Sequence, residues 1–142
     1  MKKILSSILL LLVALCMQAQ TESKPFKGYL YNSEYQVYIK MDFYDNNIVV
    51  PGQEVYGKLP GYFGARRDTR LWLITDAKIE KSGKVADLSI INDFGSEDFT
   101  ATLSLNPDGT YTLEQLKGSR LKIVVNRKWV KIPNKLILKL TK

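Results

Sequence analysis

The sequence predicts an all-β domain, folded as a small antiparallel up-and-down barrel. Apolar and polar residues alternate with a period of two through most of residues 26–140, and no apolar pattern with a helical period runs for long. Gly, Pro, Asn and Asp separate these stretches into about eight to ten strands with connections mostly of hairpin length. Short connections favour pairing between sequence neighbours, and closing such a meander removes its two exposed edges. A two-sheet β-sandwich is the alternative.

The first half contains the clearest strand, at residues 35–44. Tyr35, Val37, Ile39, Met41 and Phe43 fall on one face, and polar residues and tyrosines fall on the other. We expect further strands at 26–31, 48–50 and 55–63, the last of them broken by Gly57, Pro60 and Gly61. A turn is expected at 45–47, where Asp and Asn tolerate positive φ.

The second half continues the same pattern after a loop at 64–68. We expect strands at 71–79, 85–91, 99–105, 111–116, 121–125, 129–132 and 136–140. A polar loop spans 92–97. A tight turn spans 106–109, where Pro107 presets φ and Gly109 accepts the left-handed conformation.

The N-terminus has the layout of a secretory signal peptide. Lys2 and Lys3 precede an apolar run at 4–15, and small Ala19 offers a cleavage point. We therefore expect a signal peptide at 1–19 and a single all-β domain at 20–142, exported to the periplasm or secreted. A lipid anchor on Cys16 is the alternative, but bulky Leu15 stands where a lipoprotein leader has a small residue.

Composition narrows the chemistry. The chain has no histidine, and its one cysteine, Cys16, lies in the leader, so the mature part offers no histidine or thiol for a catalytic triad or a zinc or copper site. We expect no enzyme activity, no cofactor and no metal. The net charge is +7, with nine bases and no acid after residue 114. Export argues against nucleic acid as the partner, whereas an anionic cell-surface polymer is an alternative.

Aromatic residues gather between residues 26 and 63, and three arginines follow at 66–70. Tyrosine combines flat apolar area with a hydrogen-bonding tip, and arginine binds carboxylate, sulfate or phosphate through paired donors. Ordinary strand packing is the alternative explanation of the tyrosines, and a solvated loop that of the arginines. The candidate ligand-binding residues are Tyr29, Tyr31, Tyr38, Tyr44, Tyr56, Tyr62, Arg66, Arg67, Arg70 and Trp72.

Two later segments carry weaker signals. Residues 92–98 hold three carboxylates and an amide, which are calcium-type ligands, although the EF-hand spacing is absent. Glu97 with a second carboxylate is also the minimum for glycoside hydrolysis. In 126–133, Trp129 stands among cations, and we expect it to cover a barrel end with a cation–π contact.

Several segments resemble those of a group of small exported β-proteins from Bacteroidetes-type bacteria. The resemblance lies in 18–20, 50–54, 91–98 and 126–133, and it implies no activity. The strand count is also similar to that of lipocalin-like and avidin-like barrels. However, the Gly-x-Trp signature of lipocalins is missing, because Tyr29 and Leu30 follow Gly28.

These patterns predict an exported, non-enzymatic binding protein. Its small, partly apolar or aromatic and anionic ligand would bind at one barrel end, between tyrosines and the arginines of 66–70. The alternative is a filled barrel whose tyrosine-rich face binds another protein or a cell-surface glycan. A carboxylate-based hydrolase is a more distant alternative. The patterns predict no transmembrane segment.

Overall fold

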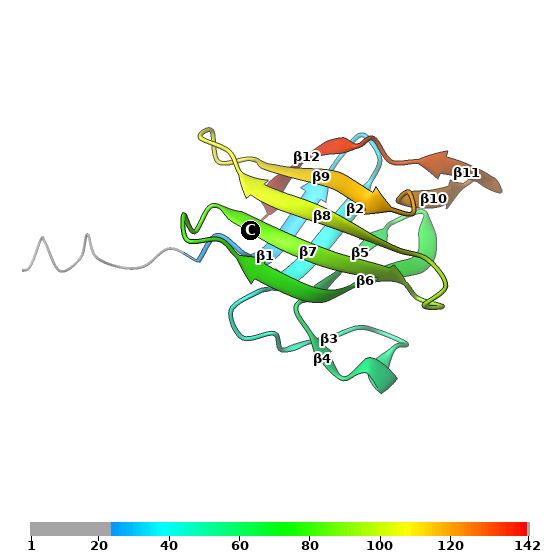
Figure 1. Ribbon diagram of the computed structural model, residues 1–142. Coiled ribbons are helices and arrows are strands. Elements are labelled where there is room, and N and C mark those ends of the chain that lie inside the picture. The colour runs from blue at the N-terminus through cyan, green and yellow to red at the C-terminus, as the bar shows by residue number, and fades with distance from the viewer. Residues whose placement is uncertain (1–23, 142) are drawn as a thin grey trace, which may run out of the picture.

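Eight strands form a closed antiparallel barrel in the computed structural model, which describes residues 24–141 (Figure 1). They are β1 (Lys27–Asn32), β2 (Val37–Asp42), β5 (Gly61–Ala65), β6 (Asp68–Ile79), β7 (Val85–Asn92), β8 (Asp98–Leu105), β9 (Tyr111–Gly118) and β12 (Lys135–Thr141). The expected barrel is confirmed and the sandwich alternative is wrong. The predicted leader at 1–19, with Cys16, lies outside the described residues.

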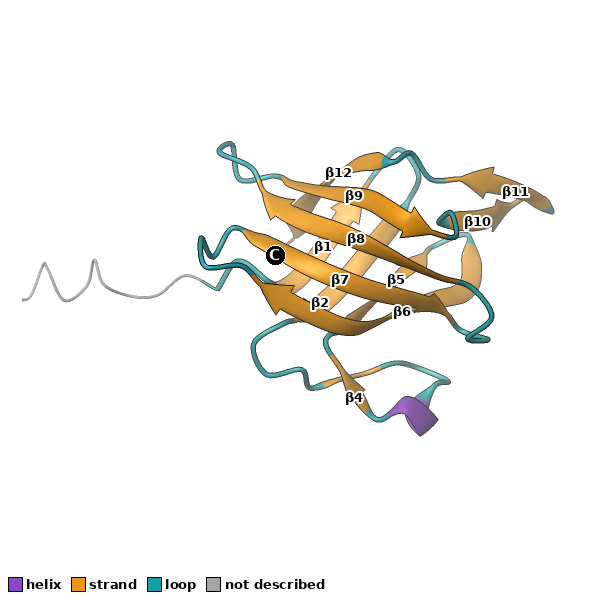
Figure 2. Cartoon of the chain, viewed as in Figure 1, coloured by secondary structure: helices purple, strands orange, loops and turns teal. Residues whose placement is uncertain are grey.

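The barrel is a meander with two insertions. Each barrel strand pairs with the next one along the chain, and β12 closes on β1. One insertion, between β2 and β5, holds β3 (Ile48–Val49), the short helix η1 (Glu54–Tyr56) and β4 (Lys58–Leu59). The other, between β9 and β12, is the hairpin of β10 (Lys122–Val125) and β11 (Lys128–Lys131). Figure 2 shows both projecting from the barrel wall.

The largest differences from the expected boundaries lie between residues 55 and 68, and the strand expected at 35–44 is shorter, at Val37–Asp42. The stretch 55–63 is broken at Gly57 and Pro60, as expected, but its first part is η1 rather than a strand, and the other parts are β4 and the start of β5. Gly57, at φ +70°, ends η1, and Pro60 separates β4 from β5 because it has no N–H to donate. The loop expected at 64–68 is only a two-residue turn, Arg66 and Arg67, so β6 begins at Asp68.

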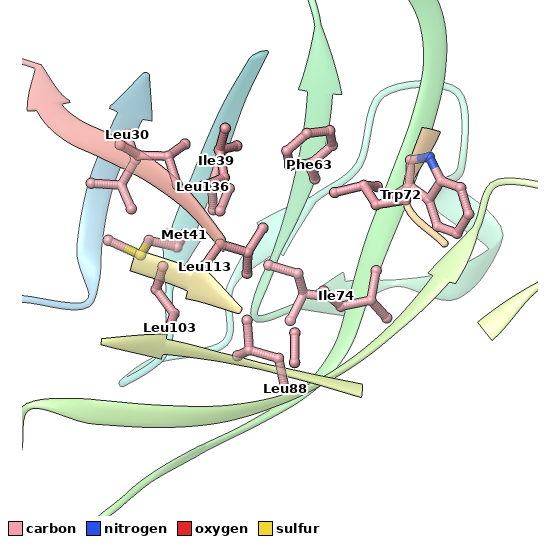
Figure 3. Close-up of a cluster of buried hydrophobic side chains, with 14 of the residues drawn as sticks. Leu30, Ile39, Met41, Phe63, Trp72, Ile74, Leu88, Leu103, Leu113 and Leu136 are labelled. Carbon is pink, nitrogen blue, oxygen red and sulfur yellow. The ribbon is translucent and has the colours of Figure 1, made fainter. Parts of the chain in front are cut away.

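The alternation of side chains fills the barrel interior. Inward positions on all eight strands are buried and belong to one apolar cluster, which includes Leu30, Ile39, Met41, Phe63, Trp72, Ile74, Leu88, Leu103, Leu113 and Leu136 (Figure 3). A barrel of eight strands has an interior just wide enough for its own side chains or for one small ligand. In this chain the side chains occupy it.

The β10–β11 hairpin covers one end of this core. Leu121, Ile123 and Ile132 are buried within the barrel cluster. The buried side chain of Gln115 donates to the carbonyls of Ile132 and Pro133 (both 3.1 Å) and accepts from the Leu121 N–H (2.8 Å). Because its polar atoms are paired, Gln115 holds the base of the hairpin against β9 without a buried unsatisfied group.

A second, smaller core lies outside the barrel. Val50 and Leu59 from the first insertion bury outward-facing Tyr62 of β5 and Leu73 of β6. The insertion therefore covers part of the outer wall, where an up-and-down barrel would otherwise meet solvent.

Candidate functional site

Two surface regions combine aromatic and charged side chains. The first, which we call the hairpin groove, has a volume of about 310 Å³. It is lined by Arg70, Leu71, Trp72, Asn92, Asp93, Phe94, Glu97, Lys122 and Trp129. The second, which we call the tyrosine face, consists of Tyr29, Tyr31, Tyr38 and Tyr62 on the outer surface of β1, β2 and β5.

Two hydrogen bonds hold the hairpin beside β6 and so form the groove. The Val124 N–H donates to Asp68 Oδ2 (2.8 Å), and the Trp72 indole Nε1–H donates to the Lys122 carbonyl (3.3 Å). Asp68 Oδ1 also accepts from the N–H and Nη1 of Arg70 (3.2 and 3.1 Å). The Asp68 side chain is only 4% exposed. It is therefore a structural carboxylate that positions both the hairpin and Arg70.

Trp129 stands on the outward face of this hairpin. It pairs with Val124 across the two strands, and its side chain is 57% exposed. Arg70 lies 5.2 Å and Lys122 lies 4.8 Å from the centroid of its ring. Both distances are within the range of cation–π attraction. The expected cation–π contact of Trp129 is therefore confirmed, whereas the barrel end is covered by the inward residues of the hairpin.

The loop at 92–97 forms the opposite wall. Asn92 organises it, because its Oδ1 accepts from the Ser96 N–H (2.9 Å) and its carbonyl accepts from the Gly95 N–H (3.0 Å). Glu97 forms an ion pair with Lys122 (3.2 Å), which links the loop to the hairpin. Phe94, at the tip, is 78% exposed. The groove therefore has Trp129 and two cations on one side, and acceptor oxygens together with the exposed ring of Phe94 on the other.

The tyrosine face is packed more tightly. The rings of Tyr29 and Tyr38 stack at 5.2 Å, and Tyr38 meets Tyr62 edge-on at 6.0 Å. Gly64, opposite Tyr38, leaves room for its ring: a Cβ there would lie 2.5 Å from the Tyr38 hydroxyl. Burial raises the pKa of Tyr38 above its ordinary value of 10.0, and Tyr62 and Tyr29 raise this pKa further. Burial and then Tyr29 raise the pKa of Tyr62.

The structure distributes the remaining candidate residues between and beyond these regions. Arg66 lies 4.4 Å from the Tyr31 ring centroid, and Arg67 donates to the Tyr35 carbonyl (3.5 Å). Tyr56, in η1, reaches the 92–97 loop, since a Cβ on Gly95 would lie 3.4 Å from its hydroxyl. Tyr44 accepts from the Phe26 N–H (3.1 Å), at the barrel end opposite the hairpin.

Of the ten candidates, only Arg70 and Trp72 line the groove, and Trp72 forms its buried floor at 4% exposure. Sequence reasoning missed that Trp129, Phe94, Glu97 and Lys122 join them. The segments 92–98 and 126–133 were each noted as candidate sites, but they come together in one groove only through the long-range pairing of β6 with β7 and the folding of the hairpin.

Two other kinds of feature are absent from residues 24–141. Those residues hold no group of three or more His, Cys, Asp or Glu side chains placed to bind a metal ion. No helix among them has the length and apolar character needed to cross a membrane.

Comparison with known proteins assigns neither a family nor a function to this chain. The chain matches no protein-family model, no curated protein and no solved structure.

Proposed function

We propose that this chain is an exported, non-enzymatic binding protein that holds a small ligand in the hairpin groove. The observation that carries the proposal is Trp129, a large aromatic ring left 57% exposed beside two cations at the rim of a groove. At protein interfaces, tryptophan, tyrosine and arginine are enriched among the residues that dominate the binding energy. The export part rests on the leader pattern at 1–19.

The groove suits a ligand with a flat face and an anionic group. Its volume of about 310 Å³ is at the small end of the range of ligand sites, about 300–1,000 Å³. The indole offers the flat contact area, and Arg70 retains guanidinium donors beyond the Nη1 that pairs with Asp68. Since side chains occupy the barrel interior, a site at this end lies on the outside of the covered barrel.

The two tryptophans provide the test, because one is buried and the other is exposed. We would record the indole N–H signals of ¹⁵N-labelled protein while adding benzoate, phenyl phosphate or methyl galacturonide. At least one probe should shift the Trp129 signal until it saturates, and Trp129→Ala should abolish binding. The matched control is Ile137→Ala, which removes a 48% exposed apolar side chain from β12. If no probe moves the Trp129 signal, the proposal fails.

The tyrosine face supports a second candidate function, binding of another protein or a cell-surface glycan. The specific observation is the exposed guanidinium of Arg66 stacked on Tyr31 at 4.4 Å, next to the Tyr29–Tyr38 pair. Tyr29→Ser with Tyr31→Ser should then abolish retention on cell-surface extracts, whereas Trp129→Ala should leave it unchanged. Equal retention of both variants would contradict this function.

A further inference from the structure

We propose that the hairpin groove binds a sugar acid, that is, a pyranose ring bearing a carboxylate or sulfate, as part of an anionic polysaccharide. This inference rests on the proposed function, because it names the ligand class of the same groove. Three features of the groove carry it: an aromatic platform, a wall of acceptors and a wall of cations.

The platform is the exposed indole of Trp129, and a second exposed ring, Phe94, lines the opposite wall. Trp129 and Phe94 are 57% and 78% exposed and lie on the same groove. A flat ring gives large apolar contact area with few rotatable bonds. One face of a pyranose ring presents C–H groups and is apolar, so it can lie on the indole while the hydroxyl groups at the ring edge point to the walls.

The acceptor wall distinguishes a sugar from other anions. Asn92, Asp93 and Glu97 line the loop side, and within residues 24–141 the Asp93 carboxylate forms no ion pair. Ionised carboxylates only accept hydrogen bonds. Sugar hydroxyls are donors and satisfy such acceptors. The carboxylates of an acidic peptide and the phosphates of a phosphodiester chain offer these acceptors no such hydroxyl donors.

The cationic wall accounts for the acid group. Arg70 and Lys122 lie 5.2 and 4.8 Å from the Trp129 centroid, so a ring stacked on the indole has its substituents beside both. Each cation has one carboxylate partner, Asp68 or Glu97, and each keeps further N–H donors. A ligand carboxylate or sulfate can therefore be bound without displacing either pair.

Basic residues continue beyond the groove, which favours a polymer over a single sugar. Arg66 and Arg67 form the exposed β5–β6 turn, and Arg127 and Lys128 lie exposed at the tip of the hairpin. Both turns lie at the covered end of the barrel (Figure 1). Exposed cations over this end attract an extended polyanion at a distance set by salt screening, about 8–10 Å at physiological ionic strength.

The decisive experiment compares ligands that share one sugar skeleton. Binding of tetragalacturonic acid and of its full methyl ester would be measured by calorimetry and by the Trp129 indole signal. The acid should bind at least about tenfold more tightly than the ester, since each charge-assisted hydrogen bond contributes about that factor. A sulfated galactotetraose tests which acid group is recognised. If it binds more tightly than tetragalacturonic acid, the group is a sulfate, and if it binds less tightly, the group is a carboxylate; either result supports the proposal.

Matched variants locate the effect. Lys122→Gln should lower affinity for the acid about tenfold and leave the weak binding of the ester unchanged. Lys81→Gln, in an exposed turn at the opposite barrel end, removes the same charge as a control and should change neither. Near-ultraviolet circular dichroism of each variant checks that the fold is retained.

The outcomes that overturn the inference are distinct. Equal affinity for acid and ester excludes charge recognition, and equal affinity for hexaglutamate or a DNA hexamer excludes sugar recognition. If benzoate shifts the Trp129 signal and no sugar acid does, the proposed binding function stands and this inference fails. If no probe shifts that signal, both fail together.

Discussion

The tyrosine face and the hairpin groove use aromatic residues in opposite ways. On the tyrosine face, Tyr29, Tyr38 and Tyr62 contact one another, and Tyr62 is buried beneath the first insertion. In the groove, Trp129 and Phe94 are exposed and their neighbours are charged. The aromatic-rich part of the sequence therefore forms mostly packed structure. The isolated indole of Trp129, in a basic segment, is instead left exposed.

This difference shows why aromatic density is a weak guide to a binding site in a β-protein. Tyrosine is a good strand former, and cross-strand aromatic pairs stabilise a sheet. A cluster in sequence is therefore explained by packing as readily as by function. Packing does not explain an exposed ring such as Trp129. Hydrogen bonds that involve Asp68 and Trp72 hold the hairpin that carries this ring, so its exposure needs another explanation.

The largest expected effect separates the two tryptophans. Trp72→Ala should lower the free energy of unfolding by about 3–5 kcal/mol, because it leaves a cavity in the core and removes the hydrogen bond to the Lys122 carbonyl. Trp129→Ala should change it by less than about 0.5 kcal/mol, as for an exposed surface site. Urea unfolding measures both. Similar losses for the two variants would mean that Trp129 is a structural residue, contrary to the proposed function.

The clamp on the hairpin should have the next largest effect. Asp68→Ala leaves the partly buried Val124 N–H without its acceptor, which costs about 1–3 kcal/mol. We expect this loss to be local: compared with the parent chain, amide hydrogen exchange should become faster in β10 and stay unchanged in β8. Asp45→Ala, at an exposed turn on the opposite barrel end, is the control and should leave both rates unchanged. Uniform acceleration across the barrel would contradict a local role of Asp68.

On the tyrosine face, Gly64→Ala should test whether the rings are packed in place. The added methyl would lie 2.5 Å from the Tyr38 hydroxyl and 2.6 Å from its Cζ, and Tyr38 is stacked against Tyr29. Overpacking of this kind costs about 1–3 kcal/mol. In a Tyr38→Ala background the same change should cost little, and the difference is the coupling energy of a double-mutant cycle. Equal costs in both backgrounds would show that the Tyr38 ring moves away freely.

Much of the fold follows from the sequence, because alternation and short connections act locally. The inward face of β2 was predicted correctly, because Val37, Ile39 and Met41 are buried, but Asp42, expected on the polar face, is buried as well. The turn at 106–109 was predicted from Pro107 and Gly109, and Gly109 has φ +86°. Closure of the barrel followed from the need to remove exposed edges, which is a property of the whole meander.

The candidate site was less predictable because it depends on long-range contacts. Arg70, Glu97 and Trp129 belong to three segments that meet only after β6 pairs with β7 and the hairpin folds over the barrel end. Asp68 lies in the segment expected to be a loop, and nothing in its local sequence shows that Val124 will donate to it. Which face of the hairpin is exposed also depends on long-range contacts, because the hairpin residues that pack against the barrel core determine which ones remain outside.

The smallest effect that we expect concerns pH and again separates the two regions. Burial, with neighbouring Tyr62 and Tyr29, raises the pKa of Tyr38 in the folded protein. Below pH 10 this hydroxyl is protonated in both states, so the shift leaves stability unchanged there. Above pH 10 it ionises first in the unfolded chain, so stability falls as pH rises toward the folded pKa.

Tyr38→Phe should reduce this alkaline loss of stability, as measured by urea unfolding between pH 9 and about pH 11. Trp129→Ala should leave the slope unchanged, because an indole does not titrate in this range. An identical slope in Tyr38→Phe and the parent chain would show that the Tyr38 hydroxyl is as solvated in the fold as in the unfolded chain, and the contrast between a packed tyrosine face and an open groove would then be lost.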